Sequence, residues 1–534
     1  FEEYGKDWIS KYSPTQEQLS QMARAALSFD YKPLISILLP VYNAPIEYLR
    51  ECIESVFAQA YPYWELCIAD DCSTNPRIRE VLNEYEERDP RIKVVYRKSN
   101  GHISEASNSA LELAQGDFLA LLDHDDLLAP HALFEMAQAV IADRSVDVLY
   151  SNEDKIDAYG DRSSPTLKGG WSPSYFLSFM YIGHLSVYRT DLVRSVGGFR
   201  VGYEGSQDYD LALRISEKTN RIKHVPEILY HWRMHPESVA LNLQAKPYAF
   251  TAARRALKEA MERREVKSAD IEQTEYPGIY RPVISLSSKT NGALVLVGHT
   301  EDPSFVTFLE KTSGIKTRII SCPRDTAQSN AEALHLTIEQ VLGEDRLDWI
   351  CVLSRDLTPR SENWLSRLVE NLGRKEIGLV GPKIINEQKQ IVAAGCSLFG
   401  SLLSYDFAGV NATSPGYGAR LVAQHDVTTV ANLCYVIRVS DLKQSNVLSF
   451  AFQSEQSFVL AISLWLHANG KQTLWTPNCK FLYTGVTRES QVDLLKAYPA
   501  DFEILKQNFG LDSYREVYYP PGLETPAANF RLAV

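Results

Sequence analysis

From residue 34 onward, short apolar runs alternate with segments in which apolar residues recur at helical spacing. The apolar runs predict strands at residues 34–39, 65–69, 92–96 and 118–122. The intervening spacing predicts helices around residues 49–57, 78–85 and 104–114, and a further helix after Pro130. Strands separated by helices of this length predict an α/β fold with a mostly parallel sheet and helices on both faces.

A second region of the same kind begins near residues 293–297 and continues through 349–353, 378–380 and 460–466. Between the two regions lies a polar stretch that contains Pro277, Gly278 and Pro282, which is typical of a linker. We therefore predict a helical lead-in followed by two tandem domains. Their boundaries are expected at 1–32 for the lead-in, 33–267 for the first domain, 268–291 for the linker, 292–520 for the second domain and 521–534 for an irregular tail.

Composition narrows the class of protein. The chain has 534 residues, of which 45% are hydrophobic and 23% charged, as in globular proteins of several domains. Its net charge of -12 argues against binding nucleic acid through the overall electric field. No run reaches the roughly 18 apolar residues of a membrane span. The eight cysteines form no CxxC pair, which favours reduced thiols in the cytosol.

Polar clusters follow three of the predicted strands. They occupy residues 40–43, 70–71 and 123–126, and the last cluster reads Asp-His-Asp-Asp. Because ligands bind at the carboxyl ends of parallel strands, we expect these clusters to converge on one crevice. Crowded carboxylates repel one another unless a cation such as Mg²⁺ or Mn²⁺ sits between them. The alternative for residues 123–126 is a solvated acidic turn before the next helix.

The order of several short motifs resembles that of the family 2 glycosyltransferases, over about residues 33–265. Further motifs resemble the members that build bacterial surface polysaccharides such as O-antigen and rhamnan-type chains. The first set comprises Ile35-Ser-Ile-Leu-Leu-Pro-Val-Tyr-Asn43, Ile68-Ala-Asp-Asp-Cys-Ser73, Ala106-Ser-Asn108, Leu121-Leu-Asp-His-Asp-Asp126, Gly197-Gly-Phe199 and Gln207-Asp-Tyr-Asp-Leu211, and the second Ser151-Asn-Glu-Asp-Lys155, Trp171-Ser-Pro173, Tyr181-Ile-Gly-His-Leu185 and Leu229-Tyr-His-Trp-Arg233.

The resemblance implies a GT-A fold and an inverting transfer of a sugar from a nucleotide diphosphate donor. Asp71 would then accept a hydrogen bond from the pyrimidine. The other residues implied to bind the nucleotide sugar are Pro40, Tyr42, Asn43, Asn108, Asp123 and Arg233, the last together with Ser238. Asp125 would ligate a Mg²⁺ or Mn²⁺ ion, with Asp123 in its shell and His231, or alternatively His235, as a further ligand.

Inversion by direct displacement requires a base that removes the proton of the acceptor hydroxyl. Asp208 is the candidate, because it stands at the start of a helix whose apolar residues include Leu211 and Leu213. The alternative is a helix-capping role beside Asp210. Trp171 and His184 are expected either to shape the sugar pocket or to pack in the core.

The second region resembles a degenerate copy of the first. Ser354-Arg355-Asp356 stands where a metal-binding acidic motif is expected, and one acid beside an arginine suits a metal poorly. Ser454-Glu455-Gln456 carries glutamine in place of the base, and Leu482-Tyr-Thr-Gly485 lacks the histidine. We expect an inactive domain. The alternative is a second active site that uses Asp356 and Glu455.

The resulting prediction is an inverting, metal-dependent glycosyltransferase that uses a UDP- or dTDP-sugar. Its acceptor would be a hydroxyl of a growing bacterial polysaccharide or lipid-linked glycan, and no nucleic acid is expected as a partner. A cytoplasmic location is expected, with peripheral association with membrane-bound polysaccharide machinery left open. The alternatives are a non-catalytic glycan-binding or assembly protein, an enzyme with two active domains, and a nucleotidyltransferase. The last is disfavoured because no Gly-rich, basic phosphate loop follows the first strand.

Overall fold

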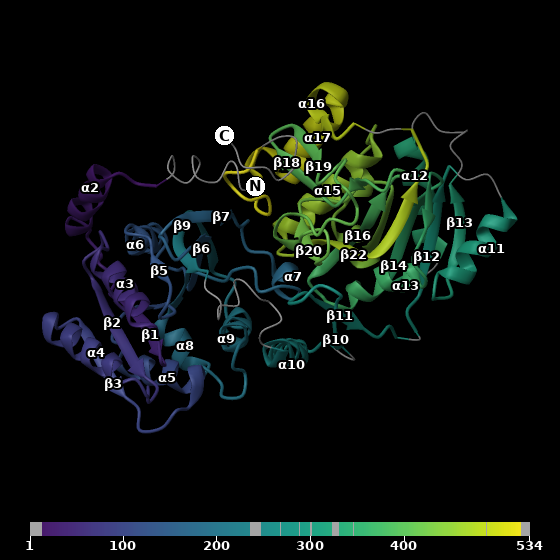
Figure 1. Cartoon of the computed structure of the whole chain (residues 1–534). Helices are drawn as coiled ribbons and strands as arrows, with labels where there is room; N and C mark the ends of the chain where they lie inside the picture. The colour runs from purple at the N-terminus through teal and green to yellow at the C-terminus, as the bar shows by residue number, and fades with distance from the viewer. Residues whose placement is uncertain are drawn as a thin grey trace.

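The computed structural model describes residues 13–234, 247–266, 269–287, 289–298, 302–322, 330–344, 346–486 and 489–524. Within these residues the chain forms two α/β halves, each built on its own large sheet (Figure 1). The first half lies on the left of Figure 1 and the second on the right, with α7 and the β10–β11 hairpin between them.

The sheet of the first half has the strand order β3-β2-β1-β4-β8-β6-β9-β5, and β7 pairs with β6. The strands β3, β2, β1 and β4 are parallel, as the alternating pattern predicted, whereas β8 pairs antiparallel with both β4 and β6. The strand bounds are β1 Ile35–Val41, β2 Trp64–Asp70, β3 Ile92–Tyr96, β4 Phe118–Leu121, β5 Leu127–Leu128, β6 Val148–Ile156, β7 Arg162–Thr166, β8 Ser186–Arg189 and β9 Ile222–Arg233.

Helices cover both faces of this sheet, because consecutive residues of β1 enter two separate cores. Ile37 and Leu39 belong to the core beneath α3, α4 and α6, and Leu38 belongs to the core beneath α5, α9 and α10. The helix bounds are α2 Gln16–Leu27, α3 Ile46–Phe57, α4 Pro76–Arg88, α5 His102–Leu113, α6 Ala132–Ala142, α7 Pro173–Phe176, α8 Thr190–Ser195, α9 Gln207–Ser216 and α10 Pro247–Arg263.

The lead-in helix α2 begins at Gln16. Thr15 is the N-cap, and its hydroxyl accepts a hydrogen bond from the backbone N–H of Gln18. The Gln18 side chain in turn accepts one from the Thr15 N–H, at 2.7 Å. This reciprocal capping box satisfies two backbone donors and explains the start of the helix.

The second half repeats the topology of the first. Its strand order, β13-β12-β14-β21-β16-β22-β15, matches β2-β1-β4-β8-β6-β9-β5 strand for strand, including the antiparallel insertion of β21 between β14 and β16. The strand bounds are β12 Gly292–Val297, β13 Arg318–Cys322, β14 Trp349–Ser354, β15 Leu357–Pro359, β16 Ile377–Ile385, β17 Ile391–Ala393, β18 Cys396–Phe399, β19 Leu402–Tyr405, β20 His425–Val427, β21 Cys434–Arg438, β22 Gln472–Tyr483 and β23 Gln491–Asp493.

One core fills the second half and includes most of its apolar residues. Helix α15 comes after β21 in the chain, as α9 comes after β8 in the first half. The helix bounds are α11 Pro303–Thr312, α12 Asn330–Glu344, α13 Trp364–Val369, η1 Glu370–Gly373, η2 Tyr417–Ala419, α14 Val439–Gln444, η3 Val447–Ser449, α15 Glu455–Ala468, α16 Leu494–Ala497, α17 Pro499–Phe509 and η4 Leu511–Ser513.

The stretch expected to be a linker folds into a hairpin. Strands β10 (Ala269–Gln273) and β11 (Tyr280–Ile284) pair antiparallel, and Tyr280 and Ile284 are buried in the core of the first half. On the opposite side, Arg281 forms a 2.6 Å ion pair with Glu370 of η1. The hairpin therefore packs against both halves rather than separating them.

A second set of contacts joins the halves at α7, which lies next to β20 in Figure 1. The Asp426 carboxylate accepts hydrogen bonds from the Ser172 hydroxyl and the Ser174 N–H, both at 2.8 Å. The Tyr417 hydroxyl accepts one from the Leu167 N–H at 2.6 Å. These buried contacts fix the segment around α7 to the second half.

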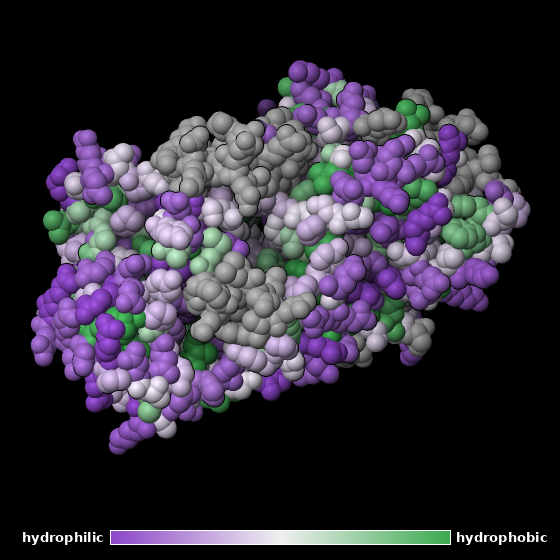
Figure 2. All heavy atoms as spheres, in the orientation of Figure 1, coloured by the Kyte–Doolittle hydropathy of each residue, from purple (hydrophilic) through white to green (hydrophobic). Residues whose placement is uncertain are grey.

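The surface of the molecule is mainly polar. On the face drawn in Figure 2, hydrophobic residues appear as scattered patches between polar ones. Within the described ranges, no helix combines the length and the apolar character needed to cross a membrane. All eight cysteines lie within the described residues, where none is part of a disulfide, and seven of them are buried.

Candidate active site

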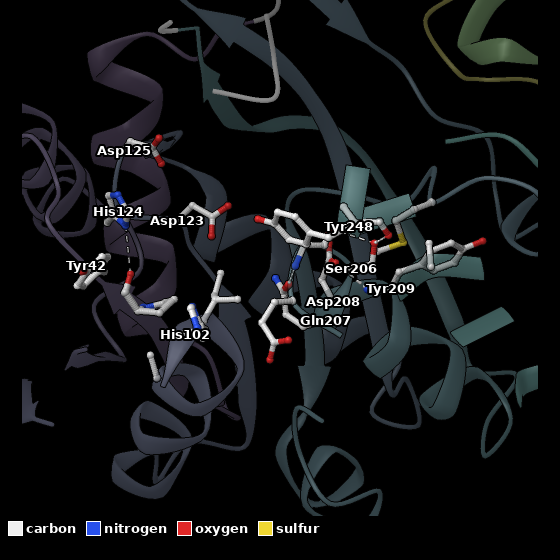
Figure 3. A pocket seen from close by; sticks show the side chains of 18 of the residues that line it. Tyr42, His102, Asp123, His124, Asp125, Ser206, Gln207, Asp208, Tyr209 and Tyr248 are labelled. Carbon is white, nitrogen blue, oxygen red and sulfur yellow. Dashed lines mark hydrogen bonds between the residues drawn. The ribbon is translucent and has the colours of Figure 1, made fainter. Parts of the chain in front are cut away.

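A cavity of about 770 Å³ opens at the carboxyl ends of β1, β2 and β4. This volume is typical of small-molecule sites. Figure 3 shows Tyr42, His124, Asp123 and Asp125 on one side of it, and Asp208 with Tyr209 on the other. The predicted site residues that line it are Pro40, Tyr42, Asn43, Asp71, Asp123, Asp125 and Asp208. Strand order explains this convergence, because the three clusters follow adjacent parallel strands.

The buried Asp71 carboxylate forms the floor of the first end of the cavity. It accepts a hydrogen bond from the Arg97 guanidinium at 2.8 Å and from the Gly101 N–H at 3.0 Å. The Asn43 side chain spans the same end, because its Oδ1 accepts a hydrogen bond from the Thr74 N–H at 2.9 Å. A carboxylate has about four acceptor positions, so Asp71 can still bind a ligand N–H.

Three non-glycine residues around this end have left-handed backbone conformations. They are Asn43 with φ 47°, Cys72 with φ 61° and His102 with φ 62°. Such backbone strain costs of order 1–3 kcal/mol per residue and clusters at functional sites. The three residues lie in the loops that follow β1, β2 and β3, and these loops form the first part of the cavity.

Tyr230 of β9 organises the acidic cluster. Its hydroxyl donates to Asp126 Oδ2 at 2.6 Å and accepts from the Asp123 N–H at 3.3 Å. Asp126 is buried, and its other oxygen accepts from the Arg233 N–H at 2.8 Å. Burial, followed by the charges of Asp125 and Asp123, raises the pKa of Asp126 well above its ordinary value. A cation in this position would relieve the repulsion between the carboxylates.

Asp123, Asp126 and His184 form a group whose ligand atoms all lie within 4.8 Å of one another. No other group of three or more acidic, histidine or cysteine residues with this spacing occurs in the described part of the chain. Two carboxylates and an imidazole are ligands that suit Mn²⁺ and, less well, Mg²⁺. His184 is held for this position by its ring, which stacks on Tyr230 with centroids 4.5 Å apart. The residues present therefore fit a divalent cation.

This group differs from the expected set, which contained Asp125 and His231. Asp125 lines the cavity but does not belong to the group. His231 lies in β9, because that strand continues to Arg233 instead of ending in a loop. Side chains alternate along a strand, so Trp232 lines the cavity whereas His231 faces the other way and bonds Asp154 at 2.6 Å. His235 and Ser238 lie outside the described residues.

Arg233 also points away from the cavity. Its guanidinium donates to the Asp125 carbonyl oxygen at 2.7 Å and to Glu51 at 2.5 Å, and it lies over the ring of Tyr48. Only 1% of the residue is exposed. Its position therefore supports the acidic loop from behind, and differs from the expected contact with the diphosphate.

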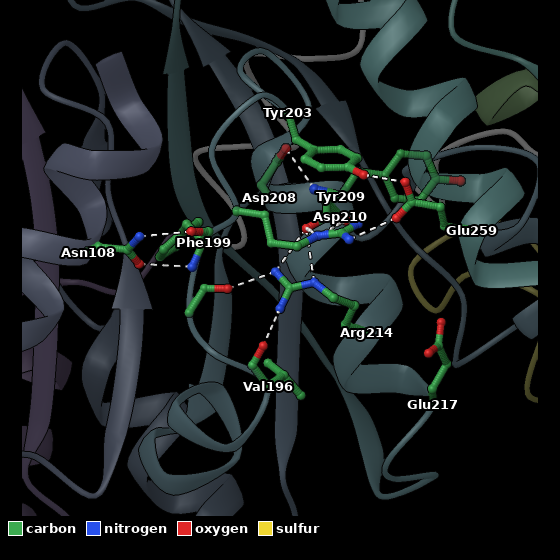
Figure 4. A network of polar contacts seen from close by, with 12 residues as sticks. Asn108, Val196, Phe199, Tyr203, Asp208, Tyr209, Asp210, Arg214, Glu217 and Glu259 are labelled. Atoms are coloured by element: carbon green, nitrogen blue, oxygen red, sulfur yellow. Dashed lines mark hydrogen bonds and ion pairs between the residues drawn. The ribbon is translucent and has the colours of Figure 1, made fainter. Parts of the chain in front are cut away.

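The Asn108 side chain likewise forms its hydrogen bonds within the protein. Its amide exchanges two hydrogen bonds with the backbone of Phe199, at 2.8 and 2.9 Å, as Figure 4 shows. These bonds tie α5 to the turn formed by Gly197 and Gly198, which precedes α9. Trp171 packs against Phe176 and Tyr181 in the core. Neither Asn108 nor Trp171 lines the cavity.

Asp208 is the second residue of α9, and its partly exposed side chain lines the cavity. Together with Asp123 and His184 it also lines a smaller hollow of about 50 Å³, so these three side chains lie around one space. Burial raises the pKa of Asp208 above its ordinary value, although nearby His184 opposes the rise. A carboxylate with a raised pKa beside a cavity is suited to act as a general base.

The cavity also contains residues that the motifs did not indicate. They include His102, Tyr248, Phe250 and Tyr280. His102 follows β3, so the strand-end rule could have found it. Tyr248, Phe250 and Tyr280 belong to α10 and β11, and nothing in the local pattern distinguishes them from ordinary core residues.

The equivalent positions of the second half have other roles. Gln456 is the second residue of α15, as Asp208 is of α9, but it is buried and bonds the Asn432 N–H at 3.0 Å and the Val430 carbonyl at 2.9 Å. After β14, which corresponds to β4, Asp356 lies 3.6 Å from the Arg355 guanidinium. Polar contacts within the protein thus occupy these two positions.

Known proteins are similar to this chain over different lengths. The profile of the family described as "Glycosyl transferase family 2" matches residues 36–197. An uncharacterized protein of Sinorhizobium fredii is 31% identical, over 100% of this chain and 62% of that protein. The O-antigen biosynthesis protein RfbC of Myxococcus xanthus is 33% identical over 73% of this chain and 32% of its own length. The chain thus spans from about a third to about three fifths of these curated relatives.

A crystal structure of S. aureus TarS 1-349 in complex with UDP-GlcNAc shares 22% identity with a TM-score of 0.35, over 43% of this chain and 66% of that chain. The family match includes Asp71, the acidic cluster and His184, and ends before Asp208. The strand order and this match confirm the GT-A-like fold that the motifs implied. Residues 36–197 therefore belong to a domain of the family 2 glycosyltransferase type.

Proposed function

We propose that the first half catalyses an inverting transfer of a sugar from a nucleotide diphosphate donor, a UDP- or dTDP-sugar, to a hydroxyl of a growing bacterial polysaccharide or lipid-linked glycan. One observation carries this proposal: Asp123, Asp125 and His184 line the same cavity as Asp208. Asp71 would receive the pyrimidine at the first end, and Tyr42 and Asn43 would line the base and ribose.

The chemical step assigns one proton to Asp208. The oxygen of the acceptor hydroxyl forms a bond to the anomeric carbon, while the bond from that carbon to the diphosphate oxygen breaks. Asp208 receives the hydroxyl proton as the attack proceeds, and the nucleoside diphosphate leaves with the bonding electrons. The raised pKa of Asp208 brings its proton affinity closer to that of the reacting group.

Asp123, Asp126 and His184 would hold a Mg²⁺ or Mn²⁺ ion, with Asp125 close by. When bound, such an ion stabilises the negative charge that develops on the departing diphosphate. Tyr230 and Arg233 hold the Asp126 carboxylate in place through the hydrogen bonds described above, and the Tyr230 hydroxyl also fixes the backbone at Asp123.

The second half is proposed to have no transferase activity of its own. At the position of the base it carries Gln456, whose amide is occupied inside the protein. At the position of the acidic motif it carries Asp356 beside Arg355. An amide cannot accept a proton as a carboxylate does, so the chemical step would lack its base.

Separate substitutions test this assignment. The first measurement is the release of nucleoside diphosphate from a panel of UDP- and dTDP-sugars with Mn²⁺. Asp208→Asn is expected to lower the rate of transfer by about 10²- to 10⁴-fold. The separate substitution Gln456→Ala is expected to leave the rate of transfer unchanged. Residual transfer in Asp208→Asn that disappears on changing Asp356 or Glu455 would instead assign activity to the second half.

We further propose a cytoplasmic enzyme that meets its acceptor at the inner face of the plasma membrane. Support comes from the cysteines, which are thiols and not disulfides, and from the similarity to an O-antigen biosynthesis protein. Cell fractionation with an antibody to the intact chain tests the location, and recovery in a secreted fraction would refute it.

A further inference from the structure

Beyond Asp208 the cavity changes its chemical character. The described apolar residues that line this far end are Phe179, Met180, Tyr209, Tyr248, Phe250 and Tyr280. In Figure 3, Tyr209 and Tyr248 lie on the side of Asp208, opposite Asp125 and His124. Tyr248 is 55% exposed, so much of its ring faces neither core nor partner side chain. Exposed aromatic rings beside a polar site commonly bind ligands.

The start of α10 is fixed above the candidate base. The Ser206 hydroxyl donates to the Ala249 carbonyl oxygen at 2.9 Å, two residues before Asp208. Gly205 has φ 81°, and a Cβ there would lie 2.8 Å from Ala249 Cβ and 3.0 Å from Tyr248 Cε2. Only glycine allows this close approach. The aromatic wall and the base therefore keep a fixed distance.

The hairpin forms the other side of the far end. Tyr280 donates its N–H to the Ser178 carbonyl at 2.8 Å, beside Phe179 and Met180. Phe250 Cε1 lies 3.9 Å from the position that a Cβ on Gly278 would occupy. Three separate elements, α10, β11 and the segment after α7, thus build one wall. Most of it lies beyond residue 197, where the family match ends.

We infer that this aromatic end, defined by Phe179, Met180, Tyr248, Phe250 and Tyr280, binds the terminal sugar ring of a neutral glycan acceptor; this inference rests on the proposed function. Displacement with inversion requires the acceptor to approach on the face opposite the leaving group. The diphosphate belongs at the acidic cluster, so the acceptor reaches Asp208 from the aromatic end. The apolar C–H face of a sugar ring packs against aromatic rings, and its hydroxyls bond the neighbouring polar groups.

Charge selects a neutral acceptor. The carboxylates of Glu204 and Asp208 line the cavity next to the aromatic wall, apart from the cluster proposed to hold the cation. A uronic acid or a phosphate on the terminal sugar would stand close to these like charges, and its desolvation would be uncompensated. Neutral hexoses and 6-deoxyhexoses carry no such charge. The hydroxyl-bearing Ser206 and the amide of Gln207 offer them polar contacts.

The experiment compares neutral hexose and 6-deoxyhexose trisaccharides with matched trisaccharides that end in glucuronic acid. Saturation-transfer NMR on the full chain measures their binding without any turnover, and steady-state kinetics measures transfer. Tyr248→Ala and Phe250→Ala are expected to raise the KM for the neutral acceptor about tenfold and leave the donor KM and acceptor-free donor hydrolysis within about twofold. Tyr248→Phe should retain wild-type values, since the ring remains. Tyr159→Ala, which removes a 93% exposed tyrosine elsewhere, is the matched control.

Three results would overturn the inference: a rise in donor KM instead of acceptor KM, preferred binding of glucuronic acid-terminated trisaccharides, or equal effects of Tyr159→Ala. The proposed function fails in a distinguishable way. If wild-type protein binds the neutral trisaccharides through Tyr248 but releases no nucleoside diphosphate from any donor, the chain is a glycan-binding protein and the subsite stands. If donors are turned over and the variants have no effect, the subsite falls and the function stands.

Discussion

Asp208 and Asp210 stand two residues apart in the first turn of α9, and their carboxylates have opposite surroundings. Asp210 is completely buried and accepts hydrogen bonds from the Arg200 and Arg214 guanidinium groups, at 3.0 and 2.9 Å (Figure 4). Asp208 lines the cavity, and its carboxylate accepts a hydrogen bond from the Tyr209 N–H at 2.8 Å. Asp210 thus anchors the helix to the protein, and Asp208 lies at the cavity.

This difference predicts that substitution of Asp208 lowers activity but not stability, whereas substitution of Asp210 lowers stability. Asp208→Asn should lower transfer by about 10²- to 10⁴-fold without destabilising the fold. Asp210→Asn should lower the free energy of unfolding by about 3 kcal/mol, because two arginines lose a buried charged partner. Urea denaturation and nucleoside diphosphate release measure the two effects. Equal loss of activity in two stable proteins would contradict the assignment.

The two histidines make a similar pair for metal binding. His184→Ala should weaken Mn²⁺ binding at least about tenfold, since His184 belongs to the candidate ligand group. His231→Ala should leave Mn²⁺ affinity nearly unchanged and lower stability, because it removes the partner of Asp154. Electron paramagnetic resonance of free Mn²⁺ measures affinity directly. The reverse pattern would restore the ligand role that the sequence suggested for His231.

Sequence reasoning located the parallel strands well, because β1, β2, β3 and β4 are apolar runs bounded by polar clusters. It therefore also located the clusters at their ends, including Asp71 and Asp123. It did not predict the orientation of His231, because no local signal shows that β9 continues through Trp232 to Arg233 and turns alternate side chains away from the cavity. Which face a residue occupies depends on strand pairing with β6, a contact across some 80 residues of sequence.

The sequence did not predict the aromatic end of the cavity, for a related reason. The hairpin from Ala269 to Ile284 begins with a mainly polar strand and contains Pro277 and Gly278, so it resembles a linker, and only its pairing shows that Tyr280 is buried. Tyr248 and Phe250 open a helix whose later alanines and leucine form an ordinary packed face. Their placement at the cavity results from contacts with Gly205 and Ser206, which no helical periodicity contains.

Asp406, in the second half, predicts a pH dependence of stability. Burial, followed by the charge of Glu516, raises the pKa of Asp406 to about 8. In the unfolded chain it titrates near about 4. Between these values the folded protein binds more protons than the unfolded one, so the free energy of unfolding falls as pH rises from 4 to 8. Asp406→Asn should flatten this slope, as measured by thermal denaturation at intervals between pH 5 and 8. Identical slopes in the two proteins would show that Asp406 is not the group responsible.

The contact between Asp426 and the segment around α7 predicts that the second half shapes the cavity of the first. Asp426 accepts hydrogen bonds from Ser172 and the Ser174 N–H, and this segment continues into Phe179 and Met180 of the cavity wall. Asp426→Ala should therefore speed amide hydrogen exchange at Ser174 and its neighbours about tenfold or more. Asp426→Asn, which keeps one acceptor oxygen, should have a smaller effect.

Asp493→Ala is the control, because Asp493 belongs to the same half and its carboxylate bonds Ser401 and Lys496 there. Unchanged exchange in residues 167–180 of Asp426→Ala would mean that other contacts suffice to hold the wall. Faster exchange with an unchanged transition for the second half would show that the effect is local. In that case the second half contributes to transfer by holding α7 and the cavity wall that follows it. It has this role although internal contacts occupy its own positions for the base and the acidic motif.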